Sequence, residues 1–292
     1  MRTLVFGVIY PGVEHYLDDY FNSIYNQTTN DFDLLIIEDG IELPQKYLKD
    51  YTIKKTVTNS APAEIREHGI NYAKENGYDL LVFTDTDDYF SPNRIENCIL
   101  NMNGNDFLVN EIVSVDNEGK ELGKIVIPRN IKFSQILDGN FFGLSNTAIL
   151  TRSLPEDLYI PKDIIAVDWW LFSLLLLNES KYEVDETSMT FYRQHSGNTS
   201  GYYNYITIEK IRFGINIKLT HYTHLSQYIL KNSLSEFTKL IDEKIDAFNK
   251  LKIAMEDDIL AKNYCQNIKQ NYNEIKNGWW SEIITLSEME KL

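Results

Sequence analysis

Residues 80–90 have the sequence LLVFTDTDDYF, in which an apolar run is followed at once by three carboxylates. The run Leu80–Phe83 predicts a short buried strand, and Asp85, Asp87 and Asp88 come directly after it. Like charges this close raise one another's pKa values unless a cation shares them. A Mg²⁺ or Mn²⁺ ion bound by the Asp-x-Asp pair is the economical explanation, and a solvated acidic turn is the alternative.

The segments around this stretch alternate strand-like and helix-like patterns. Apolar runs predict strands at residues 4–9, 34–37 and 52–57, and the spacing of apolar residues predicts helices over 16–24 and 63–75. Strands this short and this apolar are typical of a mostly parallel sheet with helices on its faces. The sequence therefore predicts an α/β fold with Rossmann-like layers.

Polar residues follow three of the predicted strands. Tyr10-Pro11-Gly12 comes after the first, Glu38-Asp39-Gly40 after the second, and the acidic cluster after residues 80–83. In sheets of this kind, ligands bind beyond the carboxyl ends of the strands. We therefore expect the three strand ends to meet at one crevice.

The remaining chain is expected to form further strands and then helices. The expected elements are a hairpin within 106–128, an apolar strand over 141–151, a buried helix over 168–177, a strand over 182–195, and amphipathic helices over 206–222 and 225–254. We divide the chain into an α/β domain, residues 1–205, and a C-terminal helical appendage, residues 206–292. We expect the region after about Tyr205 to serve docking of a second substrate, self-association into a homo-oligomer or peripheral membrane association, rather than the chemistry at the strand ends.

The charge balance excludes one class of partner. The 292 residues carry 28 Lys and Arg against 43 Asp and Glu, a net charge of −15, which repels the phosphates of nucleic acid. The same field opposes a small anionic substrate unless a metal ion or a local Arg reverses its sign at the site.

The sequence also favours one cellular compartment. The two cysteines, Cys98 and Cys265, cannot build a disulfide framework, so a reducing compartment is expected. The start MRTLVFGVIY is typical of a strand rather than a signal peptide. The apolar run 164–177 is interrupted by Asp168 and is too short to cross a bilayer. We expect a soluble, cytoplasmic protein, located at the inner face of the membrane if it associates with one.

Competing interpretations of the acidic cluster fail on spacing. An EF-hand loop starting at Asp85 would need Asp or Asn and then Gly where the chain has Tyr89 and Phe90. A dehalogenase-type phosphatase places its Asp-x-Asp nearer the N-terminus, with Thr or Val at the position of Tyr89. No P-loop and no Gly-x-Gly-x-x-Gly turn are present in the sequence.

The order of several phrases is more specific than any one of them. The chain contains five such segments in a fixed order: VFGVIYPGVEHYLDDYFNSIYNQTTNDFDLLIIEDG, AEIREHGINYAKENGYDLLVFTDTDDYFSPNRIE, FFGLSNTAILTR, VDWWLF and FYRQHSGNTSG. Together they resemble family 2 glycosyltransferases over residues 1–201. The resemblance implies a GT-A fold and transfer of a sugar from a nucleotide-diphosphate donor, a UDP- or dTDP-sugar.

The resemblance implies a set of donor-binding residues. Tyr10 and Pro11 match the turn that borders the nucleotide base, and Asp39 matches an aspartate that accepts hydrogen bonds from a pyrimidine N–H. Arg66 matches a helix Arg near the base or the phosphates. Thr86 lies inside the Asp-x-Asp motif and is counted with them.

The resemblance also implies the metal ligands and the catalytic base. Asp85 and Asp87 match the metal-binding motif, with Mn²⁺ or Mg²⁺ as the cofactor, and His195 matches a position that supplies a third ligand. Asp168 matches the general base of an inverting reaction, although Val167 replaces the Glu that precedes this Asp in the family.

The acceptor is expected on the other side of this base. Trp169, Trp170 and Arg193 are the candidate acceptor residues, since an indole can stack on the apolar face of a sugar; at least one of the two Trp is expected in the core. The acceptor itself is expected to be a glycan or a lipid-linked hydroxyl in surface polysaccharide or glycoconjugate synthesis.

Two rival functions remain open on the sequence. One is a GT-A-like module that binds sugar nucleotides or glycans without catalysis, which has no need of a base such as Asp168. The other is a sugar nucleotidyltransferase, which typically carries a Gly-rich loop with Arg or Lys after the first strand, where this chain has YPGVEHYL.

Overall fold

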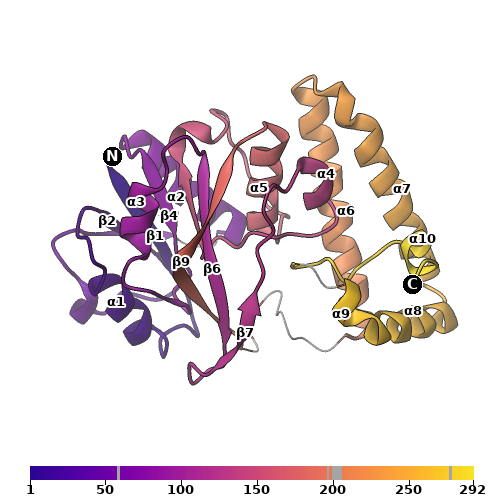
Figure 1. The fold of residues 1–292 in the computed structure, drawn as a ribbon, viewed down its shortest axis with the longest axis horizontal. Helices are drawn as coiled ribbons and strands as arrows, with labels where there is room; N and C mark the ends of the chain where they lie inside the picture. The colour runs from indigo at the N-terminus through magenta and orange to yellow at the C-terminus, as the bar shows by residue number, and fades with distance from the viewer. Residues whose placement is uncertain (58–59, 196, 199–205, 276–277) are drawn as a thin grey trace.

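The computed structural model describes residues 1–57, 60–195, 197–198, 206–275 and 278–292, and Figure 1 shows a sheet lobe followed by a helical lobe. One sheet in the described residues has the strand order β3-β2-β1-β4-β8-β6-β9-β5, with β7 paired to β6. Its strands are β1 Thr3–Ile9, β2 Asp33–Asp39, β3 Thr52–Val57, β4 Leu80–Phe83, β5 Tyr89–Phe90, β6 Phe107–Val115, β7 Glu121–Ile125, β8 Thr147–Leu150 and β9 Tyr182–Arg193. The helices are α1 Leu17–Tyr25, α2 Pro62–Glu75, α3 Arg94–Leu100, α4 Phe133–Ile136, α5 Val167–Leu177, α6 Ile208–Lys231, α7 Thr238–Ala254, α8 Asp258–Gln270, α9 Tyr272–Ile275 and α10 Leu286–Met289.

The N-terminal half of the sheet is parallel, and its strands β1, β2 and β4 are buried on both faces, whereas the edge strand β3 is partly exposed. Strand β1 pairs with β2 and β4, β2 pairs with β3, and every residue of β1 is buried. Successive residues of a strand point to opposite faces. Leu4 and Phe6 therefore pack in the core on the side of α2 and α5, whereas Val5 and Ile9 pack in the core on the side of α1 and α3. The predicted α/β layering is confirmed.

The second half of the sheet mixes directions. Strand β8 pairs antiparallel with β4 and β6, whereas β9 runs parallel to β6, and β7 forms the predicted hairpin with β6. The strand expected over 141–151 is limited to β8, Thr147–Leu150. Local hydrogen bonds explain the difference, because the N–H of Phe142 donates to Asn140 Oδ1 at 3.2 Å and that of Gly143 to Asn146 Oδ1 at 3.0 Å. These bonds fold residues 140–146 into a loop.

The C-terminal helices pack on the sheet lobe through a shared core. Helix α6 runs unbroken through the predicted gap at 223–224, because Tyr222 and Leu225 are both fully buried on its inner side. The Tyr222 hydroxyl donates to the Leu137 carbonyl at 2.6 Å, and Lys218 Nζ donates to the Asp138 carbonyl at 2.6 Å. One buried apolar cluster includes side chains of α2, α5, α6, α7 and α8. The expected boundary at residue 205 lies outside the described residues.

No helix in the described ranges combines the length and the apolar composition that crossing a bilayer requires.

Candidate active site

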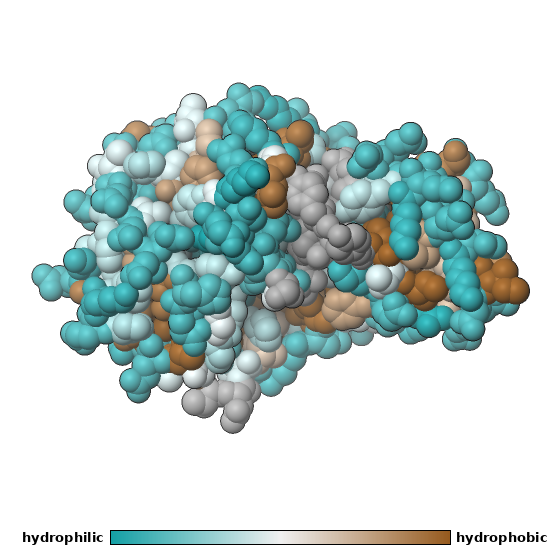
Figure 2. Space-filling view, turned by 90° about the horizontal axis from the view of Figure 1, so that it is seen from below, coloured by the Kyte–Doolittle hydropathy of each residue, from teal (hydrophilic) through white to brown (hydrophobic). Residues whose placement is uncertain are grey.

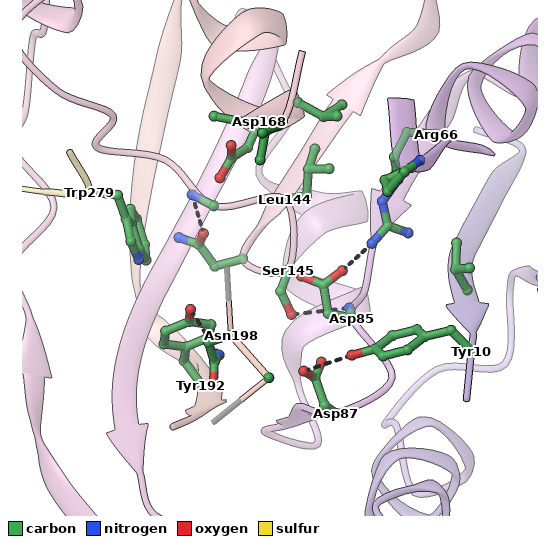
Figure 3. A pocket seen from close by; sticks show the side chains of 18 of the residues that line it. Tyr10, Arg66, Asp85, Asp87, Leu144, Ser145, Asp168, Tyr192, Asn198 and Trp279 are labelled. Carbon is green, nitrogen blue, oxygen red and sulfur yellow. Dashed lines mark hydrogen bonds and ion pairs between the residues drawn. The ribbon is translucent and has the colours of Figure 1, made fainter. Parts of the chain in front are cut away.

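A cavity of about 560 Å³ opens at the carboxyl ends of the parallel strands. Tyr10 and Pro11 follow β1, Asp39 ends β2, and Asp85 and Asp87 follow β4, and all five line the cavity. The expectation that three polar strand ends meet at one crevice is confirmed. Figure 3 shows Tyr10 and Arg66 on one side of this cavity, Trp279 on the opposite side, and Asp85 and Asp168 between them.

Arg66 neutralises Asp85, the first carboxylate of residues 85–88, which we call the acidic loop. It projects from α2, and its Nη2 donates to Asp85 Oδ1 at 2.6 Å in a mostly buried pair. Burial raises the pKa of Asp85, and the Arg66 charge opposes that rise. The backbone N–H of Asp85 donates to Ser145 Oγ at 3.2 Å, which fixes the loop against the 140–146 segment. The Asp85 carboxylate of the Asp-x-Asp motif is therefore already paired with a cationic side chain, Arg66.

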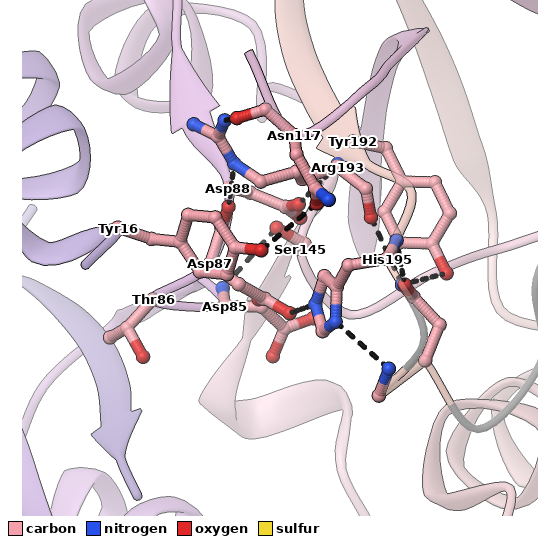
Figure 4. A network of polar contacts seen from close by, with 12 residues as sticks. Tyr16, Asp85, Thr86, Asp87, Asp88, Asn117, Ser145, Tyr192, Arg193 and His195 are labelled. Atoms are coloured by element: carbon pink, nitrogen blue, oxygen red, sulfur yellow. Dashed lines mark hydrogen bonds and ion pairs between the residues drawn. The ribbon is translucent and has the colours of Figure 1, made fainter. Parts of the chain in front are cut away.

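Asp87 is held by two other side chains, as Figures 3 and 4 show. Its Oδ2 accepts from the Tyr10 hydroxyl at 3.2 Å and lies 2.9 Å from His195 Nε2. The other ring nitrogen, His195 Nδ1, accepts from the Gly197 N–H at 3.1 Å, so the ring proton lies on Nε2 and points at Asp87. The Asp87 and His195 side chains are each 13% exposed.

The possible metal ligands around Asp87 fit a divalent cation only in part. Within the described ranges, no three His, Cys, Asp or Glu side chains already converge as a metal site. Asp87 and His195 do converge, and they offer a carboxylate oxygen and an imidazole nitrogen. Metal binding by His195 Nε2 requires its proton to move to Nδ1, at the expense of the Gly197 contact. The other carboxylate expected to bind the metal, Asp85, is paired with Arg66 instead.

Arg193 supports the acidic loop from inside the protein and does not face the cavity. Its guanidinium is 1% exposed and donates to the Asp87 carbonyl at 2.9 Å, the Asn117 carbonyl at 2.6 Å and Asp19 Oδ2 at 2.8 Å. Its backbone N–H donates to Asp88 Oδ1 at 2.9 Å (Figure 4). The acceptor role expected for Arg193 is therefore corrected, because all these donors point into the protein.

Asp88 is a buried member of the cluster to which the sequence assigned no separate role. Its side chain is 1% exposed, and burial beside the Asp87 and Asp85 charges raises its pKa well above the ordinary value. It belongs to the support of the loop rather than to the cavity wall, because it meets the β9 backbone at Arg193.

Asp168 lines the cavity from the first turn of α5. Its Oδ1 accepts from the Trp169 N–H at 2.8 Å, one of the free donors of the helix start. Burial raises the pKa of Asp168 to about 7, and the nearby Asp85 charge adds to the rise. A half-buried carboxylate that titrates near neutral pH can take up a proton during a reaction.

Three further expected site residues do not line the cavity. Thr86 is fully buried, and its hydroxyl donates to the Val8 carbonyl at 2.6 Å. It therefore connects the ends of two strands and does not contact a sugar donor.

Trp169 is fully buried, its ring centroid lies 4.1 Å from that of His221 in a stacked pair, and its Nε1 donates to the Ile136 carbonyl at 2.7 Å. Trp170 is 2% exposed and donates from Nε1 to the Tyr159 carbonyl at 3.1 Å. Both indoles belong to the core, which corrects their expected acceptor role.

The cavity contains residues that the sequence did not indicate. They come from the 140–146 loop, from β9 and the residues after it, and from the C-terminal segment: Leu144, Ser145, Asn146, Tyr192, Asn198, Trp279 and Trp280. The pair Trp279-Trp280 is the visible signal among them, but its position 111 residues after Asp168 gives no hint of proximity. A β-bridge from Trp279 to Asn140, with hydrogen bonds of 2.8 and 2.7 Å, brings the segment to the cavity.

Comparison with solved structures gives the fold class. The chain resembles S. aureus TarS 1–349 in complex with UDP-GlcNAc, with 17% identity, a TM-score of 0.58, and coverage of 94% of this chain and 92% of that one. It resembles the mannosyltransferase PcManGT from Pyrobaculum calidifontis in complex with GDP-Man and Mn²⁺, with 11% identity, a TM-score of 0.55, and coverage of 97% and 83%. Against a longer S. aureus TarS chain, with 16% identity and a TM-score of 0.52, 78% of this chain covers 43% of that one. The fold is that of the GT-A glycosyltransferases.

Comparison with protein families then gives the membership. Residues 8–154, half of the chain, match Glycosyl transferase family 2. The chain belongs to this family and is a glycosyltransferase. A comparison with curated proteins found no match.

Proposed function

We propose that the protein transfers a sugar from a nucleotide-diphosphate donor to an acceptor hydroxyl in one displacement, with inversion at the anomeric carbon. Nucleotide-sugar glycosyl transfer is supported by the family and by neighbours bound to UDP-GlcNAc or to GDP-Man with Mn²⁺. The observation that carries the proposal is Asp168, a carboxylate whose pKa is raised to about 7, in the wall of the same cavity as the Asp85–Asp87 loop.

The donor occupies the side of the cavity formed by the first two parallel strands. Tyr10, Pro11 and Asp39 border the base, and the Asp39 carboxylate accepts a hydrogen bond from a pyrimidine N–H, which favours UDP or dTDP. Arg66 faces the same space and offers its charge to the phosphates. A local cation is needed here, because the net charge of the chain is −15.

A divalent cation bound beside Asp87 would assist the departure of the diphosphate. Asp87 and His195 would hold it, and the imidazole favours Mn²⁺ over Mg²⁺, which prefers oxygen ligands throughout. When bound, the ion neutralises the charge that develops on the leaving oxygen. Tyr10 and Arg193 keep Asp87 in place through its carboxylate and its backbone carbonyl.

Asp168 accepts the proton of the acceptor hydroxyl as that oxygen attacks. A bond forms between the acceptor oxygen and the anomeric carbon, the bond to the diphosphate oxygen breaks, and the proton moves to the carboxylate. Burial makes Asp168 a stronger base than an exposed Asp, since the charged form is disfavoured before the reaction.

The acceptor is a glycan or a lipid-linked hydroxyl in surface polysaccharide or glycoconjugate synthesis. The reaction takes place in the cytoplasm, and at the inner face of the membrane if the protein associates with one. The compartment is supported by the free, buried thiols of Cys98 and Cys265, which suit a reducing environment.

A screen of nucleotide sugars tests this function directly. Thermal unfolding and donor hydrolysis are measured with UDP-, dTDP- and GDP-sugars, each with and without Mn²⁺. We expect a uridine or thymidine donor to stabilise the protein only with the metal and to be hydrolysed slowly. Asp168→Asn is the matched variant, expected to keep the stabilisation and lose hydrolysis. No stabilisation and no turnover with any donor would refute the proposal.

A further inference from the structure

The side of the cavity opposite the donor carries two indole rings, next to Tyr192 and Asn198 (Figure 3). Trp279 and Trp280 line it and are 5% and 7% exposed. Gly278 makes the approach of this segment possible, since its φ is +95° and an added Cβ would lie 2.2 Å from the Asn140 carbonyl oxygen. Trp280 in turn packs 3.7 Å from the Cβ position of Gly214 on α6. The wall is therefore fixed by close backbone packing.

Apolar residues continue from this wall to the outside. Ile165 lines the main cavity and also a small adjoining cavity of about 70 Å³, whose lining includes Phe213. The Phe213 ring lies 6.1 Å from the Trp280 ring. Ile165 and Phe213 are 47% and 43% exposed, although both are large hydrophobic residues. We call these two residues, together with Trp280, the apolar exit.

The location of the apolar exit distinguishes it from scattered surface hydrophobics. Isolated exposed apolar residues are ordinary, whereas a set continuous with a ligand cavity marks a binding surface. Figure 2 shows hydrophobic residues on the face where the sheet lobe meets the helical lobe. The donor side, by contrast, presents Asp39, Arg66 and Asp85.

We propose that the acceptor is an amphiphile, whose hydroxyl-bearing sugar lies between Asp168 and Trp279 and whose apolar group leaves over the apolar exit. This inference rests on the proposed function and narrows its acceptor from any hydroxyl to a pyranoside with an apolar aglycone. The apolar group gains affinity because it leaves water against Ile165 and Phe213 without disturbing the donor side.

Matched pairs of acceptors test the inference. Methyl and octyl β-D-pyranosides of glucose, galactose and N-acetylglucosamine are compared below the micelle concentration, with the nucleotide sugar that the wild-type protein hydrolyses fastest. We expect kcat/KM for the octyl member of the used pair to exceed that for the methyl member about tenfold, as two buried methylene groups would give. The gain should appear in KM rather than in kcat.

Substitutions then locate the effect. Phe213→Ser should reduce the octyl preference to about threefold or less, while donor hydrolysis and transfer to the methyl glycoside stay within about threefold of wild type, because Phe213 lines the adjoining cavity and not the main one. Leu230→Ser is the matched control, because Leu230 is also on α6 and 66% exposed but lies 17 residues from Phe213. This control should keep the full preference.

Three outcomes would overturn the inference while leaving donor chemistry intact: equal use of octyl and methyl members, a full preference that survives in Phe213→Ser, or donor hydrolysis without transfer to any of the pyranosides. If the wild-type protein neither binds nor hydrolyses any nucleotide sugar, the proposed function itself fails, and the inference falls with it.

Discussion

The pH dependence of Asp168 gives the sharpest test of the catalytic assignment. With a pKa of about 7, the carboxylate is ionised to about 9% at pH 6, 50% at pH 7 and 91% at pH 8. A reaction that needs the ionised base should therefore accelerate about fivefold from pH 6 to 7 and less than twofold from pH 7 to 8. Asp168→Asn should lower the rate about 10²–10⁴-fold and abolish this rise, since an amide cannot take the proton.

The assay is release of the nucleotide diphosphate at saturating donor and Mn²⁺, followed at each pH, with calorimetry to check that the variant still binds the donor. Asp50→Asn, a change at an exposed carboxylate, is the control and should behave as the wild type. A flat profile above pH 6, or turnover of Asp168→Asn within a few-fold of wild type, would refute the reasoning.

The same carboxylate makes a prediction that needs no substrate. The pKa of Asp168 is 3.8 in its ordinary state and about 7 in the folded protein, so the unfolded chain releases this proton more readily. The free energy of unfolding should fall as pH rises from about 4 to 7, by at most about 4 kcal/mol, and stay level above that range. Asp168→Asn should remove this fall and be more stable than wild type at pH 8. Urea unfolding at pH 5 and pH 8 measures the free energy of unfolding of the two proteins. The same difference between wild type and Asp168→Asn at both pH values would contradict the prediction.

Further predictions concern the loop and the C-terminal segment. Asp87→Ala should abolish the Mn²⁺-dependent part of UDP binding in calorimetric titration while cooperative unfolding persists; unchanged affinity would contradict the metal assignment. Gly278→Ala should lower the free energy of unfolding by about 1–3 kcal/mol, because it adds a clash with Asn140 to a positive φ. Gly104→Ala, at φ +81° in open space, is the control for the φ penalty alone in the same urea titrations, and an equal loss there would rule out the clash. Arg193→Gln should lower both thermal stability and the Mn²⁺ affinity measured by electron paramagnetic resonance, since it removes the donor to the Asp87 carbonyl; a variant with wild-type metal affinity would argue against this support.

The sequence predicted the strand-based half of the site well, because the relevant residues are adjacent to elements with strong periodicity. Asp39 ends a strand with the apolar centre Leu34–Ile37, Asp85 follows the fully apolar strand β4, and parallel strands bring their carboxyl ends to one edge. The family phrases added Asp168, which depends on α5 rather than on the sheet. All three line the cavity.

The rest could not be predicted, since it depends on side-chain direction and on long-range pairing. Trp169 and Trp170 follow the candidate base directly, but in a helix successive residues point about 100° apart, and these two face the core. Arg193 has the charge of a substrate-binding residue, and only the fold reveals that its donors are used by carbonyls beneath the loop. Trp279 reaches the cavity through a bridge to Asn140 that no local pattern encodes.

That bridge also constrains the order of events during synthesis. Asn140 and Trp279 are 139 positions apart, so one wall of the cavity forms only after the segment around Trp279 has been synthesised. The parallel strands β1, β2 and β4 and their carboxylates leave the ribosome much earlier, and contacts of short sequence separation form first. A nascent chain therefore has its donor side before the wall that carries Trp279. Sugar transfer should begin only after the segment around Trp279 has been synthesised and has docked on Asn140.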